Sequence, residues 1–270
     1  MAKIIAVTNQ KGGVGKTTTA INLAAALAIA GRNVLLVDCD PQGNATSGIG
    51  KKGERAESGT VYEALTAAEG EPPQNFILPT SVDRLSLIPA NRELAGAEIE
   101  LISFPDRERR LQRLLEPLRA HFDFIIIDSP PSLGLLTLNA LVAADRVLIP
   151  LHCEYFALEG LADLVGTMRR VRASLNPALD IEGVLLTMND ERTNLGQQVG
   201  RDVREFFKEK VYTTVIPRNV RLAEAPSHGL PAVTYDAKSR GAEAYFSFAN
   251  ELLKNNSEHA PNEPRTANSE

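Results

Sequence analysis

Short uninterrupted runs of apolar residues recur along the chain, and longer segments with helical spacing separate them. Such runs are typical of parallel strands that helices cover on both faces. Strands are therefore predicted over residues 4–7, 34–37, 85–88, 124–128, 147–151, 184–186 and 213–216. Helices are predicted over residues 20–30, 61–68, 111–118, 133–143, 157–174, 197–208 and 242–253. This alternation predicts an α/β domain with a mostly parallel, twisted sheet and helices on both faces.

Two details of the pattern modify this picture. Pro117 should kink or shorten the helix in which it lies. Residues 255–270 contain no Val, Ile, Leu, Met or aromatic residue, so they cannot bury enough apolar surface to order themselves. We therefore predict one domain over residues 1–254 and a disordered polar tail over residues 255–270.

The composition, with 43% hydrophobic and 23% charged residues in 270, is ordinary for a globular protein. No apolar run approaches the length of a membrane span, and the chain opens into a strand instead of a signal peptide. Cys39 and Cys153 lie far apart and form no C-x-x-C motif. We therefore expect a reduced, cytoplasmic setting and no membrane association.

A glycine-rich segment joins the first predicted strand to the first predicted helix. Backbone N–H groups of such a turn can wrap a phosphate at the positive end of the helix dipole. Lys16 would reach the β- and γ-phosphates, and the Thr17 hydroxyl would hold Mg²⁺. The match to G-x-x-x-x-G-K-[ST] is incomplete, because Gln10 replaces the first glycine. The predicted nucleotide-binding residues here are Gly12, Gly13, Val14, Gly15, Lys16, Thr17 and Thr18. The plainer alternative is a glycine-rich turn with two solvated lysines.

Two predicted strands end in carboxylates. Asp38 and Asp40 follow the second strand, and Asp128 ends an apolar run in the Walker B pattern. Open α/β sheets bind ligands at the carboxyl ends of their strands. Thr17, Asp40 and Asp128 are therefore the predicted metal site, and Asp40 would also orient or deprotonate the attacking water. Asp38 would support the metal site from behind, although it and Asp40 could simply form a turn before Pro41.

The glycine-rich segment, with its additional Lys11, resembles the deviant Walker A motif of the ParA/MinD class of P-loop ATPases. Residues 38–44, 127–133, 154–160 and 216–221 are similar to the chromosomal ParA/Soj branch of that class, and the resemblance covers about residues 2–253. It implies a single-domain P-loop NTPase that uses ATP and Mg²⁺ to partition chromosomes or plasmids. Its ATP-bound homodimers would bind DNA non-specifically and be stimulated by a ParB-type centromere-binding protein.

The same resemblance implies roles for individual residues. Lys11 would reach across a face-to-face dimer to the partner's nucleotide, which makes Lys11, Lys16 and Asp40 the expected catalytic residues. Gly12 would have to be small because two backbones meet there. The residues implied to border the adenine are Met188, Pro217 and Asn219.

The distribution of charge bears on the expected DNA partner. The net charge of −5 argues against nucleic-acid binding, but residues 192–240 hold nine Lys or Arg against five Asp or Glu. The candidates for phosphate contacts in expected loops are Arg192, Arg218, Arg221, Lys238 and Arg240. Alternatively, Arg218 serves the nucleotide pocket and the others are solvated. DNA binding would place the protein on the nucleoid.

Other functions within this P-loop class need features that the sequence lacks. An iron–sulfur carrier needs closely spaced cysteines, and a membrane-binding MinD-type regulator would end in a basic amphipathic helix. A related tyrosine kinase would carry a C-terminal tyrosine cluster, which is absent. A nucleotide-binding switch or structural filament subunit without useful hydrolysis is disfavoured because Lys11 and Asp40 are both present.

Overall fold

The computed structural model describes residues 1–66, 71–154, 157–188 and 194–258. A seven-stranded sheet forms its centre, with the strand order β3-β4-β2-β5-β1-β6-β7. All neighbouring strands are parallel except β3, which pairs antiparallel with β4. The strands are β1 (Lys3–Val7), β2 (Val34–Asp38), β3 (Leu78–Pro79), β4 (Leu85–Ile88), β5 (Phe124–Asp128), β6 (Arg146–His152) and β7 (Asp180–Thr187). The predicted α/β class is confirmed.

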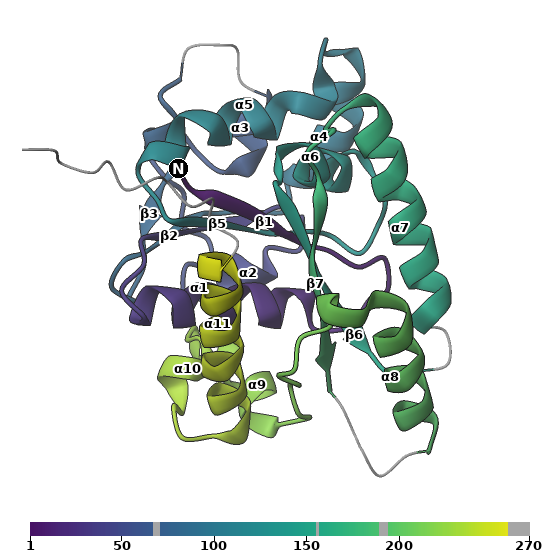
Figure 1. The fold of residues 1–270 in the computed structure, drawn as a ribbon. Coiled ribbons are helices and arrows are strands. Elements are labelled where there is room, and N and C mark those ends of the chain that lie inside the picture. The colour runs from purple at the N-terminus through teal and green to yellow at the C-terminus, as the bar shows by residue number, and fades with distance from the viewer. Residues whose placement is uncertain (67–70, 155–156, 189–193, 259–270) are drawn as a thin grey trace, which may run out of the picture.

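Helices cover both faces of the sheet, and Figure 1 shows them above and below the central strands. One face packs against α3 (Val61–Thr66), α4 (Leu94–Glu100), α5 (Arg110–Leu115), α6 (Leu135–Ala143), α7 (Ala157–Ser174) and α8 (Asn194–Phe207). The other packs against α1 (Lys16–Ile29), α2 (Asn44–Gly48), α10 (Ala232–Tyr235) and α11 (Arg240–Glu258). A short helix, α9 (Val220–Glu224), precedes α10.

The central strands are apolar throughout because alternate side chains enter different cores. In β1, Ile4 and Ala6 lie in the core beneath α3–α8, whereas Ile5 and Val7 lie in the core beneath α1 and α11. In β5, residues 124–127 alternate between the two cores in the same way, and Asp128 at the strand end is also buried. A strand with one solvated face would instead alternate apolar and polar residues.

The segment at 213–216 is not a strand, so that prediction is wrong. Val211 makes an isolated bridge with Val184, and the amides of Tyr212 and Ile216 donate to the Val184 and Leu186 carbonyls of β7 at 3.0 and 2.9 Å. No regular ladder forms between these two contacts. The N–H groups of Thr213 and Thr214 donate to the Glu251 carboxylate of α11, at 2.7 and 2.9 Å. A side chain from a distant helix thus takes the donors that a strand would use in its ladder.

Other boundaries follow local signals. The helix containing Pro117 ends at Leu115, and a 3₁₀ turn over Glu116–Ala120 replaces its last part, as the proline predicted. The short antiparallel strand β3 was not predicted. Within the described parts of the chain, no helix combines the length and apolar character that a membrane crossing requires.

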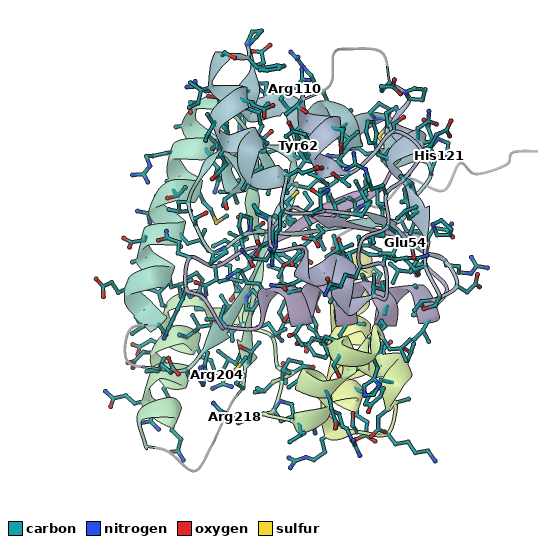
Figure 2. The ribbon with its side chains drawn as sticks, turned by 180° about the vertical axis from the view of Figure 1, so that it is seen from behind. Glu54, Tyr62, Arg110, His121, Arg204 and Arg218 are labelled. Atoms are coloured by element: carbon teal, nitrogen blue, oxygen red, sulfur yellow. The ribbon has the colours of Figure 1, made fainter. Side chains whose placement is uncertain are left out.

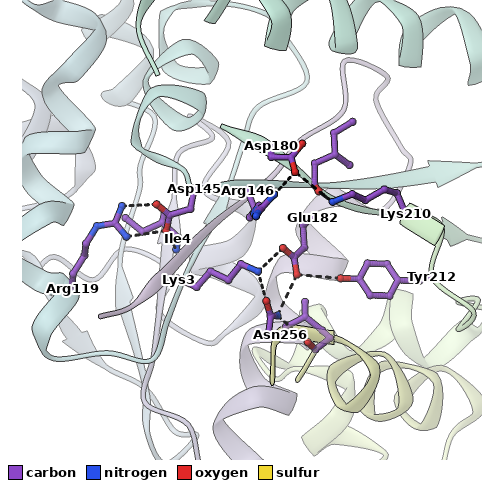
Figure 3. A network of polar contacts seen from close by, with 12 residues as sticks. Lys3, Ile4, Arg119, Asp145, Arg146, Asp180, Glu182, Lys210, Tyr212 and Asn256 are labelled. Atoms are coloured by element: carbon purple, nitrogen blue, oxygen red, sulfur yellow. Dashed lines mark hydrogen bonds and ion pairs between the residues drawn. The ribbon is translucent and has the colours of Figure 1, made fainter. Parts of the chain in front are cut away.

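The C-terminal helix continues past the predicted boundary at residue 254. It runs to Glu258, because Asn256 joins a polar network with the sheet (Figure 3). The Asn256 amide donates to Glu182 at 3.2 Å and accepts from Lys3, which also pairs with Glu182 at 2.7 Å. The predicted disorder of residues 255–258 is therefore wrong; residues 259–270 lie outside the described residues.

Candidate nucleotide-binding and active site

The carboxyl ends of the central parallel strands bring the predicted residues to one edge of the sheet. Val7 at the end of β1 pairs in register with Asp128 at the end of β5, and Asp128 pairs with Asp38 at the end of β2. The glycine-rich loop leaves β1 at this edge and enters α1 at Lys16. Ligand sites of open α/β sheets occupy this position.

The glycine-rich loop has the backbone geometry of an anion cradle. Gly13 and Gly15 have φ values of +73° and +86°, which other residues rarely adopt. Apart from the chain neighbours, no heavy atom of the described residues lies within 4 Å of a Cβ built on Gly12 or Gly13. Helix α1 begins without a side-chain cap and without an acidic residue in its first turn, which leaves its N-terminal N–H groups to bind an anion.

Two polar residues that were not among the predicted site residues fix this loop. The Asn9 amide donates to the Pro150 carbonyl at 2.8 Å and accepts the Lys11 N–H at 3.0 Å. The Thr187 hydroxyl donates to the Val14 carbonyl at 2.8 Å. Both side chains are buried, and each lies at or just beyond a strand end. In the sequence, a polar residue at or just after the end of an apolar strand is the feature that could have identified each of them.

Lys16 lies inside the loop it belongs to. Its ammonium group donates to the Lys11 carbonyl at 3.0 Å, and the residue is only 7% exposed. Burial lowers its pKa, while the charges of Asp128 and Asp40 act in the opposite direction. A polyanion bound in the loop would therefore meet a desolvated positive charge, for which Coulomb interactions are strong.

The three acidic residues have different surroundings. Asp38 is fully buried, and its carboxylate accepts from the Thr46 amide and hydroxyl at 2.8 and 2.7 Å and from the Asp40 amide at 3.2 Å. Burial raises its pKa to about 6, although these hydrogen bonds favour the ionised form. Asp40 is also buried, at 8% exposed, and accepts from the Gln42 amide at 2.9 Å.

Asp128 differs from Asp38 in its hydrogen bonding. It is fully buried, and neither carboxylate oxygen has a hydrogen-bond partner among the described residues. Burial raises its pKa well above the ordinary value, the neighbouring Asp38 raises it further, and Thr17 lies close enough to oppose the shift. Two acceptor oxygens without donors, next to a second carboxylate, fit a site for a cation.

The donor set fits Mg²⁺ carried by a nucleotide better than a metal held by protein alone. Within the described ranges, no three carboxylate, imidazole or thiol groups are arranged to hold a metal ion. Mg²⁺ at nucleotide sites takes one or two protein oxygens and completes its shell with phosphate and water. Thr17 and Asp128 can supply such oxygens here, and bound Mg²⁺ would neutralise phosphate charge.

Lys11 contacts the end of β6 instead of the cradle. Its ammonium group forms an ion pair with Glu154, which also lies 2.9 Å from the His152 imidazole. The hydrogen bond from Lys11 lowers the pKa of Glu154, and His152 and Arg218 also favour its charged form. Arg218 therefore lies within electrostatic range of the loop mouth. Figure 2 shows it at the same end of the molecule as Arg204 of α8.

The three residues that were expected to border the adenine have different surroundings from one another. Met188 has a left-handed φ of +49°, and its Cε would lie 3.7 Å from a Cβ built on Gly15, so its side chain is next to the loop. Pro217 is half-buried. Asn219 caps α9 by accepting the Arg221 amide at 2.9 Å, so its side-chain oxygen already has a structural partner.

The expected DNA contacts need two corrections. Arg221 is not a loop residue with few acids nearby: it lies in α9 and pairs with Glu224 at 2.7 Å and Asp236 at 3.3 Å. Arg240 is the first residue of α11 rather than part of the preceding loop. Arg218 and Lys238 are exposed outside helices, as expected. Arg192 lies outside the described residues.

An α/β sheet with a phosphate cradle, a buried lysine and an unpartnered carboxylate at one edge defines a P-loop nucleotide-binding protein. Residues 2–181 match the family described as AAA domain. The sporulation initiation inhibitor protein Soj of Bacillus subtilis is 58% identical over 255 residues, which are 94% of this chain and 100% of that protein. The chromosome-partitioning ATPase Soj of Treponema pallidum is 52% identical over 94% of this chain and 98% of its own.

A solved structure extends the comparison to bound ligands. Cobyrinic acid a,c-diamide synthase from Mycobacterium smegmatis, with ADP and magnesium, has a TM-score of 0.81 at 40% identity. The alignment covers 95% of this chain and 96% of that one. The chain belongs to the ParA/Soj family of partitioning ATPases. It is an ATPase whose cofactors are ATP and Mg²⁺.

Proposed function

We propose that this protein partitions DNA as an ATP-dependent homodimer, binding DNA without sequence preference and responding to a ParB-type partner. The partitioning role is supported by the similarity to chromosome-partitioning relatives, and the ATP dependence by the Asp128 carboxylate, unpartnered among the described residues, beside the loop that holds Lys16 and Thr17. The solved structure's name assigns a different activity to that protein, but the partitioning relatives are more similar to this chain.

In the proposed hydrolysis each residue has one task. Backbone N–H groups of residues 12–17 and the Lys16 ammonium hold the phosphates, while Thr17 and Asp128 bind Mg²⁺, which neutralises phosphate charge. Asp40, the least buried of the three acids, orients the attacking water or takes its proton. Asp38 is saturated by three donors and supports the site without contacting the phosphates.

In this proposal, Lys11 makes ATP hydrolysis depend on dimerisation. Its ammonium group points to Glu154 and not into its own cradle, although its backbone carbonyl contacts Lys16. Gly12 beside it is exposed and has open space around its Cα, which lets a second backbone approach. A face-to-face dimer would exchange the Glu154 contact for the partner's nucleotide, and this adds positive charge where the transition state is negative.

The DNA surface lies over residues 192–240 and includes Arg192, Arg218, Arg221, Lys238 and Arg240. A surface ion pair contributes little free energy. Arg221 could therefore exchange its pairs with Glu224 and Asp236 for a DNA phosphate at little cost. A dimer would double the number of contacts along one face, so DNA binding would require ATP and would place the protein on the nucleoid.

The experiment compares ATP-dependent DNA binding of wild type, Arg192→Ala and Arg221→Ala by fluorescence anisotropy on two unrelated duplexes at several salt concentrations. Both substitutions should weaken binding equally on each duplex and reduce the log–log salt slope by about 0.9 per lost phosphate contact. Arg32→Ala, an exposed arginine outside this region, is the control. If only the control weakens binding, the DNA surface lies elsewhere.

The ATPase rate is then measured alone, with DNA, and with DNA plus a ParB-type protein. We expect the full mixture to be fastest. Equal rates in all three conditions would reject the proposed regulation while leaving the ATPase assignment intact.

A further inference from the structure

Thr46 closes the loop that carries Asp40. It lies in α2 and is 2% exposed. Its amide and its hydroxyl both donate to Oδ2 of Asp38, at 2.8 and 2.7 Å, across the seven residues between them. Its hydroxyl oxygen also accepts the Ala90 amide, at 2.9 Å, just beyond the end of β4. One side chain thus ties the two ends of the loop together and attaches them to a neighbouring strand.

Asp40 lies inside the closed loop and depends on it for its position. Its amide donates to Oδ1 of Asp38 at 3.2 Å, and its backbone carbonyl accepts the Gly43 amide at 2.9 Å. A Cβ built on Gly43 would lie 3.1 Å from the Ala90 carbonyl, so the loop packs closely on the β4 end. Oδ1 of Asp40 accepts the Gln42 amide, which aims the carboxylate.

We propose that Thr46 is a positioning residue for ATP hydrolysis, which fixes Asp40 by closing the loop between β2 and α2 on the Asp38 carboxylate. The inference rests on the role proposed above for Asp40. Thr46 reaches neither the cradle nor the phosphates, because its polar atoms are engaged by Asp38 and Ala90. Its influence on the reaction passes through the loop alone.

The chemistry of the Thr46 side chain decides which substitution is informative. Valine has the same shape but can neither donate to Asp38 nor accept from Ala90, so both ties of the side chain are lost. Serine keeps the hydroxyl and loses only the methyl group. The phosphate loop has separate supports in Asn9 and Thr187, so ATP binding should not depend on Thr46.

The test measures kcat and KM for ATP, nucleotide affinity by calorimetry, and urea unfolding for Thr46→Val and Thr46→Ser. A displacement of about 1 Å at a catalytic group costs up to roughly 100-fold in rate. We expect Thr46→Val to lower kcat about 10- to 100-fold with KM and nucleotide affinity within about twofold. Thr46→Ser should recover most of the rate.

The matched control is Thr60→Val. Thr60 is also fully buried, and its hydroxyl likewise donates to a carboxylate, Glu63, and accepts a backbone amide, that of Tyr62. Thr60→Val should lose a comparable amount of stability while kcat stays unchanged. If it lowers kcat as much as Thr46→Val does, loss of stability explains both and the positioning role is rejected.

Asp40→Ala, measured in parallel, separates this inference from the role it rests on. If Asp40→Ala turns over normally, the proposed role of Asp40 fails. If Asp40→Ala stalls but Thr46→Val keeps wild-type kcat, only the positioning role of Thr46 fails. Equal impairment by valine and serine at position 46 would also overturn it, since serine restores the hydroxyl.

Discussion

Replacing Asp38 with asparagine should stabilise the nucleotide-free protein at neutral pH. Burial raises the pKa of Asp38 from 3.8 to about 6, which corresponds to about 3 kcal/mol of lost stability when the group is ionised. Asparagine removes the charge and can still accept both hydrogen bonds from Thr46. Its NH₂ group would face the Asp40 amide, so the 3.2 Å hydrogen bond is lost at about 1 kcal/mol. The net gain is about 2 kcal/mol.

The pH dependence identifies the cause of this gain. In the unfolded chain Asp38 ionises near pH 4, but in the folded protein it stays protonated until about pH 6. The folded state therefore binds more protons in this window, and wild-type stability falls as pH rises through it. The advantage of Asp38→Asn should be absent below about pH 4, grow between about pH 4 and 6, and stay constant above.

Urea unfolding of wild type and Asp38→Asn, without nucleotide and at several pH values from 4.5 to 7.5, measures this difference. Asp123→Asn is the control, because Asp123 is exposed and also accepts a backbone amide, from Asn33 at 2.8 Å. It should show no gain. A destabilised Asp38→Asn variant at pH 7.5, or a difference that is constant across the range, would refute the argument from burial.

Three further changes test the site and the fold. Lys16→Ala should weaken ATP binding at least about 30-fold in calorimetry, because a buried charge facing phosphate is removed; the exposed Lys52→Ala should bind normally. Lys11→Ala should bind ATP as a monomer and fail to dimerise in light scattering, and a wild-type dimer would make Lys11 a surface lysine. Gly229→Ala should cost about 2–4 kcal/mol in urea unfolding, because φ is +66° and its Cβ would lie 2.7 Å from the Gly50 Cα. Gly53→Ala, with φ of +79° and open space, should cost only about 1 kcal/mol.

Features that depend on neighbouring residues could be predicted from the amino-acid sequence alone. An apolar run such as 124–127 can be recognised without its partners, because a strand buried on both faces needs apolar residues at every position. The glycine-rich loop is equally local, since left-handed φ values at Gly13 and Gly15 require glycine wherever the loop lies. Strand ends at Asp38 and Asp128 then predicted one sheet edge for the site.

Features that depend on contacts between distant segments could not be predicted and follow from the folded chain. Glu251 of α11 takes the backbone donors of Thr213 and Thr214, so the predicted strand at 213–216 does not form. Asn256 holds the C-terminal helix beyond its expected end, and Glu224 and Asp236 pair with Arg221. Asp38 and Asp128 are both buried carboxylates, yet Thr46 supplies donors to the first alone. The local sequence pattern does not identify such partners, because each hydrogen bond joins residues that are brought together only when the chain folds.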